Sequence, residues 1–545
     1  MRLINFFLSQ TQTSLPRLVM MALVAGGTNS ALLAVVNGAA DHIENGRPQI
    51  ASVVLFLIFI SAYVYAQRYV LVTTSAEVER LVHAYREKLI TQLKRCELRE
   101  VEHIGRGRIF SAISTDTQAI SQSATGLVYG VQSAVLIACI AVYLAMISMT
   151  SFVIASVFLG MTASIYVRRM RDVHGLFHDA SNEENKLHDL VSGFLDGFKE
   201  VKLSSRRAAA VLADVVTVSA RTAEYRTDAQ RSMSLNFIFA QAAFMMLLGT
   251  LVFLTPMFGN TYSGTVMGSM TTVMFLIGPI SGIIGSVPLV AVANAAAENL
   301  QNLEELLNAH TRERNGDPLA PTPTSPALRT IELRRVYFKH EANGSGFAVG
   351  PLDLTIRAGE TVFITGGNGS GKSTLIKLIV GLYPPLSGDL LVDDIPVTPA
   401  SAQAHRDRFC AVFSDFHLFR KLYGVPLPDV RSAATWLEEM ELTGKTEILP
   451  DGYSTIDLSS GQRKRLALLS ALLEDKPVIV LDEWAADQDP PFRRKFYDVL
   501  LPRWKALGKT IIAVTHDDRY FQIADRRFHL EEGQLRNLAE IPTNG

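Results

Sequence analysis

The first 290 residues alternate long apolar stretches with charged segments. A helix needs about 20 apolar residues to cross the hydrocarbon core of a bilayer. The uncharged run from 124 to 167 is long enough for two such helices, joined by a tight turn near Ser148–Ser151. We therefore expect six membrane spans, over Leu18–Ala40, Ala51–Val70, Ala124–Ile147, Phe152–Val167, Leu235–Phe258 and Thr265–Val290.

Basic residues gather in two of the segments between these spans. Eight Lys or Arg lie within residues 80–108 and eleven within residues 168–231, whereas the loop Asp41–Ile50 has only Arg47 and Phe258–Gly264 has none. Because Lys and Arg are retained on the cytosolic side of a membrane, both basic segments and both termini are expected there. Both segments lack proline, so we expect them to continue the spans as helices.

Composition narrows the class of protein further. Hydrophobic residues make up 48% of the 545-residue chain, charged residues 19%, and the net charge is −1. This balance indicates a membrane protein and gives no reason to expect nucleic acid as a partner. Cys96, Cys139 and Cys410 are far apart, so neither a metal site nor a disulfide framework is expected.

A glycine-rich motif dominates the second half of the chain. It follows an apolar, β-branched run, Thr361–Thr365, and precedes a helical pattern over Leu375–Val380. This is the strand–loop–helix context of a phosphate-binding loop, in which backbone N–H groups surround a triphosphate, the lysine reaches the β- and γ-phosphates and the serine hydroxyl holds Mg²⁺. The predicted ATP site comprises Gly366, Gly367, Asn368, Gly369, Ser370, Gly371, Lys372, Ser373 and Thr374.

This motif also bears on the uncharged stretch 259–297, which could hold one span or two. Two spans would put the loop outside the cell, where ATP is scarce. One span that continues into a cytosolic helix is therefore preferred.

A segment with four prolines, Thr311–Leu328, separates the two halves. Proline-rich polar segments form extended linkers. We therefore predict a transmembrane domain over 1–310, a linker over 311–328 and an α/β P-loop nucleotide-binding domain over 329–545.

A second apolar strand, Val478–Leu481, ends in two acids, Asp482 and Glu483. At about 110 residues after the phosphate loop, this pattern predicts that Asp482 holds Mg²⁺ through water. Glu483 is then expected to polarise the attacking water.

Leu458-Ser459-Ser460-Gly461-Gln462 opens another helix, and with it the chain resembles the ATP-binding cassette (ABC) transporter family. The family's signature is Leu-Ser-Gly-Gly-Gln, so Ser460 replaces one glycine. Ala486–Asp489 matches the family's D-loop, and His516 follows the strand Ile511–Val514 as the family's switch histidine does. The resemblance implies that His516 acts with Glu483 and Lys372 in catalysis, and that Ser459, Ser460, Gly461 and Gln462 contact ATP.

The resemblance covers the whole chain, because six spans followed by one nucleotide domain is the layout of an exporter half-transporter. It implies a homodimer in which the phosphate loop of one copy and the signature of the other enclose each ATP. A heterodimer stays open. ATP binding and hydrolysis would then drive alternating access.

Two positions depart from the family pattern. His340 stands where an aromatic residue stacks on adenine, and Tyr337 or Phe338 could substitute, although only Phe338 shares the face of His340 in a strand. Ser414 stands where the family has a glutamine that contacts Mg²⁺, which a serine hydroxyl can also do. We expect nucleotide binding to survive both changes.

Two further motifs resemble the family's cyclic-peptide export branch, which includes exporters of peptide siderophores such as pyoverdine and of lasso-peptide microcins. They are Val412–Phe419 and Gly197–Leu203. The branch implies a bacterial inner-membrane protein with peptide cargo. Because the first span begins at Leu18, no leader peptidase is expected before it. Two segments resemble the family's coupling regions, Gly105–Thr117 and Gly197–Leu203. We expect both to contact the nucleotide domain near Ser414–Phe419.

Polar groups are few within the spans, where they bond between helices or line a cargo path. Arg68 is the one charge there, at a cytosolic end, which argues against a proton-driven antiporter. The alternatives to peptide export are a lipid flippase or multidrug exporter, and a membrane ATPase acting as a sensor or regulator. The polar groups are Asn29, Ser30, Asn37, Gln67, Tyr129, Gln132, Asn236 and Gln241.

Overall fold

The computed structural model describes residues 15–44, 50–254, 257, 263–311, 328–340, 346–425 and 427–537. The chain divides into two compact units. The membrane unit comprises Met1–Lys88 and Phe110–Leu303, and the C-terminal unit comprises Leu89–Ile109 and Glu304–Gly545. The predicted linker 311–328 lies almost wholly outside the described residues, so the boundaries at 310 and 329 stay predictions.

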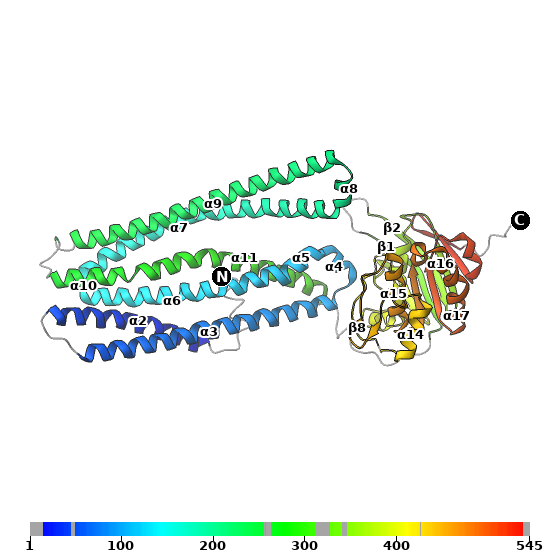
Figure 1. The fold of residues 1–545 in the computed structure, drawn as a ribbon, viewed down its shortest axis with the longest axis horizontal. Helices are drawn as coiled ribbons and strands as arrows, with labels where there is room; N and C mark the ends of the chain where they lie inside the picture. Colours follow the sequence, from blue (N-terminus) through cyan, green and yellow to red (C-terminus); the bar gives the residue numbers. More distant parts are fainter. Residues whose placement is uncertain are drawn as a thin grey trace. The chain divides into compact units, whose positions relative to one another are not determined.

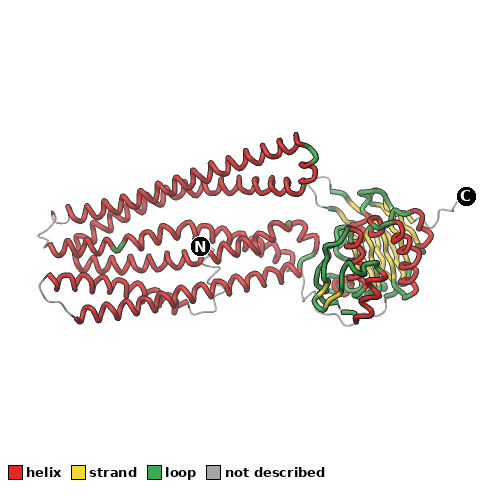
Figure 2. The backbone as a smooth tube through the Cα atoms, viewed as in Figure 1, coloured by secondary structure: helices red, strands yellow, loops and turns green. Residues whose placement is uncertain are grey.

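The membrane unit is built from long helices (Figures 1 and 2). Six helical stretches are long and apolar enough to cross a membrane, which confirms the six spans expected from the sequence. The helices are α2 (Leu15–Glu44), α3 (Ile50–Arg95), α5 (Arg106–Ser111), a π-helical turn (Ala112–Asp116), α6 (Thr117–Ile147), α7 (Met149–Asp196), α8 (Phe198–Lys202), α9 (Ser205–Leu254), α10 (Ser263–Met274) and α11 (Ile277–Thr311).

The basic segments do continue the spans as helices. α3 runs on to Arg95, and α7 and α9 pack against each other over most of their length (Figure 1). The expected turn between the third and fourth spans is a single residue, Ser148, whose side chain accepts a bond from the Ser151 N–H at 3.2 Å and caps α7.

The sixth span differs from the single helix that we expected. It is interrupted at Phe275 and Leu276, between α10 and α11. Pro279 explains the break, because a proline ring clashes with the carbonyl four residues earlier, here that of Phe275. Pro288, by contrast, lies within α11.

Glycines let α2, α6 and α11 approach one another closely. A Cβ on Gly26 would lie 2.7 Å from Val135 Cγ1, and one on Gly282 would lie 2.4 Å from Ser133 Oγ. Small residues at such crossings replace the hydrophobic effect, which cannot hold helices together in lipid.

The C-terminal unit has two main sheets. An antiparallel sheet has the order β2-β1-β4-β5, and a mostly parallel sheet has the order β12-β11-β3-β10-β9-β6. The strands are β1 (Thr330–Lys339), β2 (Ala348–Arg357), β3 (Thr361–Thr365), β4 (Ser387–Val392), β5 (Ile395–Pro396), β6 (Phe409–Val412), β7 (Ile448–Leu449), β8 (Gly452–Tyr453), β9 (Val478–Asp482), β10 (Thr510–Val514), β11 (Arg526–Glu531) and β12 (Gln534–Asn537).

Helices pack around the parallel strands, and one core cluster joins β9 and β10 to α15 through Leu466, Leu481 and Ile511. β3, β9 and β10 are buried along their whole length, as strands inside a parallel sheet are. The helices are α12 (Lys372–Val380), α13 (Ala402–Arg406), α14 (Val430–Glu439), α15 (Ser460–Leu472), α16 (Pro490–Lys495) and α17 (Leu501–Ala506), with shorter turns at Trp484–Asp487, Phe496–Leu500 and Asp518–Ile523.

A short helix from the first half of the chain, α4 (Leu98–Ile104), belongs to the C-terminal unit. The Tyr383 hydroxyl donates to Glu102 at 2.7 Å, and Arg406 pairs with Glu97 at 3.3 Å. These contacts lie upstream of the region 105–117 that resembles a coupling segment. That 105–117 and 197–203 meet the segment 414–419 stays a prediction.

The close approach of α6 and α11 can be tested with two glycines of one helix. Gly282→Leu places a branched side chain where Ser133 already lies, and such overpacking costs about 1–3 kcal/mol. We expect the melting temperature of the detergent-solubilised protein to fall by at least about 3 °C. Gly285→Leu is the control, because nothing lies within 4 Å of a Cβ at Gly285. Equal melting temperatures for the two variants would contradict this packing.

Candidate nucleotide-binding and catalytic site

The phosphate loop connects the end of β3 to the start of α12, as the sequence predicts. Gly366 and Gly371 have φ of 149° and 103°, and a Cβ on Gly366 would lie 2.2 Å from the Leu530 carbonyl oxygen, so only glycine fits there. A cavity of about 370 Å³ opens at this point. It is lined by Phe347, Asn368, Gly369, Gly371, Lys372, Ser373, Thr374 and Glu483.

Lys372 is buried and is held over the loop. Its Nζ donates to the carbonyls of Gly366 at 3.1 Å and Gly367 at 2.9 Å, and it lies 3.6 Å from Glu483 Oε1. The ammonium group therefore stands between the loop and the acidic residue, where it can meet the terminal phosphates of a nucleotide.

Three oxygen-bearing side chains meet at the end of β9. Ser373 Oγ donates to Asp482 Oδ2 at 3.0 Å, and Ser414 Oγ donates to the same atom at 3.2 Å. Asp482 is buried, and its Oδ1 makes no hydrogen bond within the described part of the chain. A carboxylate with a free oxygen beside two hydroxyls is the donor chemistry that Mg²⁺ prefers, so these residues fit the predicted ion.

Glu483 adopts a left-handed backbone conformation, with φ 49° and ψ 33°. Such conformations are costly for a residue with a side chain and cluster at functional sites. The conformation is fixed by the Glu483 N–H, which donates to the Val514 carbonyl at 3.2 Å. His516 Nε2 lies 3.3 Å from Glu483 Oε1, so the structure brings these two predicted catalytic residues together.

The predicted signature begins α15, where Ser459 is the N-cap. Its side chain accepts from the Gln462 N–H at 3.4 Å, and the Gln462 side chain accepts from the Ser459 N–H at 3.2 Å. Gln488 donates to the Gly461 carbonyl at 3.4 Å. Ser459 and Ser460 are exposed, so this helix N-terminus is open to a ligand or a second chain.

α15 is also tied to Glu483. Lys464 donates to the Glu483 carbonyl at 3.3 Å and pairs with Asp487 at 2.7 Å, and the buried Trp484 indole donates to the Lys464 carbonyl at 2.9 Å. The signature helix is therefore bonded directly to the backbone on both sides of the predicted catalytic acid.

His340 lies beside the cavity but does not line it. Its Nε2 is 3.1 Å from Thr374 Oγ1, and its ring packs edge-on against Phe338 and Tyr383. Burial lowers the pKa of His340, which favours the neutral imidazole. Phe338 is itself buried and stacks on Tyr383, so it is a core residue.

Sequence reasoning missed Phe347, which does line the cavity. Nothing in the local sequence singled it out, because it matches no motif that we used. Phe347 reaches the cavity only because β1 and β2 pair.

Comparisons with known proteins agree with this geometry. A family model for ABC transporters matches residues 349–486. ATP-binding protein SyrD of Pseudomonas syringae pv. syringae is 36% identical over 479 residues, which are 86% of this chain and 84% of SyrD. An ATP-dependent lipid A-core flippase of Burkholderia orbicola is 30% identical over 224 residues, covering 39% of this chain and 37% of the flippase.

The fold matches a solved structure over nearly its whole length. A bacterial Atm1-family ABC exporter with ATP bound gives a TM-score of 0.74 at 18% identity, covering 95% of this chain and 93% of that chain. The architecture of six long apolar helices followed by an α/β nucleotide-binding domain is therefore that of an ABC exporter. The chain belongs to the ABC transporter family, as a multi-pass membrane protein whose ABC ATPase is coupled to transport.

Proposed function

We propose that this chain exports a modified or cyclic peptide, or a peptide siderophore, across the bacterial inner membrane as a homodimer driven by ATP. The observation that supports ATP hydrolysis as the energy source is the cluster of side chains around Glu483. Lys372 and Glu483 line one cavity, His516 contacts Glu483, and Asp482 precedes Glu483 in the chain, so three separate stretches of sequence meet here.

Each residue has a defined part in hydrolysis. Lys372 and the loop N–H groups bind the phosphates, and Ser373, Ser414 and Asp482 hold Mg²⁺, which when bound neutralises charge on the phosphate oxygens. Glu483 accepts a proton from the attacking water, and His516 orients the Glu483 carboxylate through their 3.3 Å contact.

The exposed signature supports a dimer of two equivalent sites. Ser459 and Ser460 face solvent, while Gly461 and Gln462 are held by the capping bonds and by Gln488. A signature of this kind contributes to an ATP site only when a second copy brings its own phosphate loop to it. A partner with a different sequence, giving a heterodimer, is the alternative.

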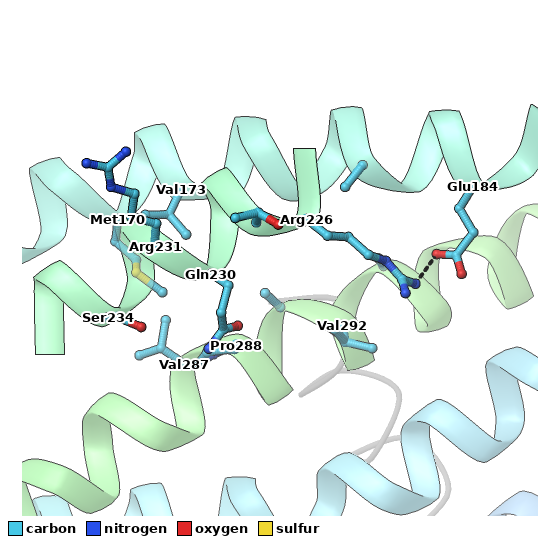
Figure 3. A pocket seen from close by; sticks show the side chains of 14 residues that line it. Met170, Val173, Glu184, Arg226, Gln230, Arg231, Ser234, Val287, Pro288 and Val292 are labelled. Carbon is cyan, nitrogen blue, oxygen red and sulfur yellow. Dashed lines mark hydrogen bonds and ion pairs between the residues drawn. The ribbon is translucent and has the colours of Figure 1, made fainter. Parts of the chain in front are cut away.

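Cavities in the membrane unit support a cargo of mixed polarity. One of about 1020 Å³ lies between α7, α9 and α11 (Figure 3). Val173, Val287 and Val292 supply apolar walls, and Arg226 pairs with Glu184 at 2.5 Å. A second cavity of about 540 Å³ shares Met170 and Val287 with the first and is mostly apolar.

A third cavity is lined by four of the eight polar residues that the sequence analysis singled out in the spans. It is about 240 Å³, and Gln67 donates to Gln132 across it at 3.1 Å. Uncharged amides and hydroxyls match the backbone groups of a peptide better than they match a simple ion. The polar lining favours a peptide over a lipid. The mostly apolar cavity of about 540 Å³ is the feature that would also suit a lipid flippase or a multidrug exporter. The polar side chains around it are Asn29, Tyr63, Gln67, Tyr129, Gln132 and Ser133.

Glu483→Gln removes the proton acceptor and keeps the shape of the side chain. In nanodiscs we expect ATPase turnover to fall at least about 100-fold while ATP still binds, because the phosphate-binding groups are untouched. Glu438→Gln, on the exposed face of α14, is the matched control. Turnover near the wild-type rate in Glu483→Gln would remove this residue from the catalytic role.

Cysteine cross-linking between differently tagged copies tests the dimer. Cys96 and Cys139 are first replaced by serine, whereas Cys410 stays, because burial raises the pKa of its thiol to about 12 and keeps it unreactive. A copy with Asn368→Cys and a copy with Ser460→Cys should form an ATP-dependent disulfide in the Glu483→Gln background. Thr435→Cys on exposed α14 replaces Ser460→Cys as the control. Equal cross-linking in both pairs would contradict the composite site.

Cargo class is tested in proteoliposomes with three probes. A fluorescent pyoverdine-type peptide siderophore should accumulate inside inside-out vesicles with ATP, and not with Glu483→Gln. A fluorescent phosphatidylethanolamine and ethidium test the flippase and multidrug alternatives. ATP-dependent movement of the lipid or of ethidium, without movement of the peptide, would overturn the peptide proposal.

A further inference from the structure

Two glutamines meet in the cavity of about 240 Å³ in the membrane unit, and one of them is incompletely bonded. Gln67 Nε2 donates to Gln132 Oε1 at 3.1 Å, whereas Gln132 Nε2 is buried and has no hydrogen-bond partner among the described residues. An amide side chain offers two N–H donors and one carbonyl acceptor. The single bond therefore leaves the N–H groups of Gln132 and the carbonyl oxygen of Gln67 for another molecule.

An unbonded amide is costly in this part of the chain. Both glutamines belong to helices that are long and apolar enough to cross a membrane, where lipid supplies no hydrogen bonds. The cavity beside them is polar, because Asn29, Tyr63 and Tyr129 also line it. A ligand that entered it would supply the hydrogen bond that Gln132 lacks, and leaving such a buried donor unmade is what costs free energy.

The break in the sixth span lies at the same cavity. The helix is interrupted at Phe275 and Leu276, and Gly278 and Pro279 line the cavity just beyond. Pro279 has no N–H to donate to the Phe275 carbonyl. Non-helical backbone is tolerated at membrane depth only where it is buried in protein or lines a cavity. The walls come from α2, α3, α6 and α11, so one copy of the chain supplies them all.

The lining selects a neutral ligand that has both a donor and an acceptor. No charged side chain of the described residues lines the cavity, and the free N–H groups of Gln132 repel a cation. A carboxamide fits, because its oxygen can accept from Gln132 and its N–H can donate to Gln67. The cavity is smaller than the about 300–1,000 Å³ that encloses a drug-sized ligand, so it takes one side chain and not a whole peptide.

We propose that this cavity binds a carboxamide side chain, that of an asparagine or a glutamine, of the exported peptide, and that Gln132 is the residue that selects for it. The inference rests on the proposed peptide cargo and adds the class of side chain that the cavity recognises. Gln67 determines which group of Gln132 is left to bind the ligand, because their hydrogen bond occupies Gln132 Oε1.

The site itself is tested with propionamide, which is a glutamine side chain as a free molecule. Thermal unfolding of the full-length, detergent-solubilised protein is followed with propionamide, with propionate, which is charged, and with butanone, which lacks the N–H. We expect propionamide alone to raise the melting temperature, by at least about 2 °C at saturation, because a ligand of the folded state stabilises it.

Variants assign this shift to the glutamine pair. Gln132→Met keeps the length of the side chain and removes its hydrogen bonds, so it should abolish the shift, and Gln67→Met should do the same. Gln241→Met is the matched control, because Gln241 is an exposed residue of α9 that does not line the cavity, and it should keep the full shift.

The cargo side chain is tested with two fluorescent cyclic peptides that differ at one position, which is Gln in one and Met in the other. ATP-dependent uptake into inside-out proteoliposomes gives the half-saturating concentration of each. For wild type and Gln241→Met we expect a value about 5- to 150-fold lower for the Gln peptide, because the Met peptide leaves Gln132 unbonded. Gln132→Met should take up both peptides equally.

Three melting results would overturn the carboxamide site: no shift with propionamide, as for a cavity that holds only water, an equal shift with butanone, or a shift that survives in Gln132→Met. A higher melting temperature in sodium chloride than in choline chloride, lost in Gln132→Met, would make it a cation site instead. Equal uptake of both peptides by wild type would overturn the selection. Failure of the proposed function is a separate result, in which propionamide stabilises wild type and neither peptide is taken up; the carboxamide site would then stand and the peptide cargo would not.

Discussion

The carboxylate of Asp482 is the point on which the catalytic half of the molecule depends. A buried anion is costly unless it is hydrogen-bonded or pairs with a cation. Here two hydroxyls, Ser373 from α12 and Ser414 from the segment after β6, satisfy one oxygen and leave the other open. The ends of β6 and β9 and the start of α12 are thereby held together, at the edge of the sheet where ligands bind in open α/β folds.

A second group of contacts connects the segment around Glu483 to α15, whose N-terminus lies at the surface of the domain. The Lys464 ammonium and the Trp484 indole join the backbone of β9 to α15, and Gln488 joins the same turn to Gly461. A shift of the carboxylate toward a nucleotide would therefore move the exposed signature with it.

Much of this arrangement was predictable from the sequence, because it rests on local rules. Apolar length alone located the six spans, and the loop Gly366–Lys372 and the strand ending at Asp482 each carry their chemistry within a few residues. Features that depend on tertiary pairing were not predictable. Phe347 acquires its place only from the β1–β2 register, and the contacts of α4 with Tyr383 and Arg406 join segments with no shared motif.

The break at Phe275 was only partly predictable from the sequence. Its cause, Pro279, is visible in the sequence, but uniform apolarity around it concealed the interruption. Hydropathy reports whether a segment enters lipid and says nothing about whether its backbone is continuous.

The contacts of α4 also set an order of events during synthesis. Glu97 and its partner Arg406 are 309 positions apart, and Glu102 and Tyr383 are 281 apart. At about 5–20 residues per second, the ribosome delivers the later partner roughly 15–60 s after the earlier one. Throughout that interval Glu97 and Glu102 of α4 are without Arg406 and Tyr383. The C-terminal unit therefore cannot complete its contacts with α4 until Arg406 has been synthesised.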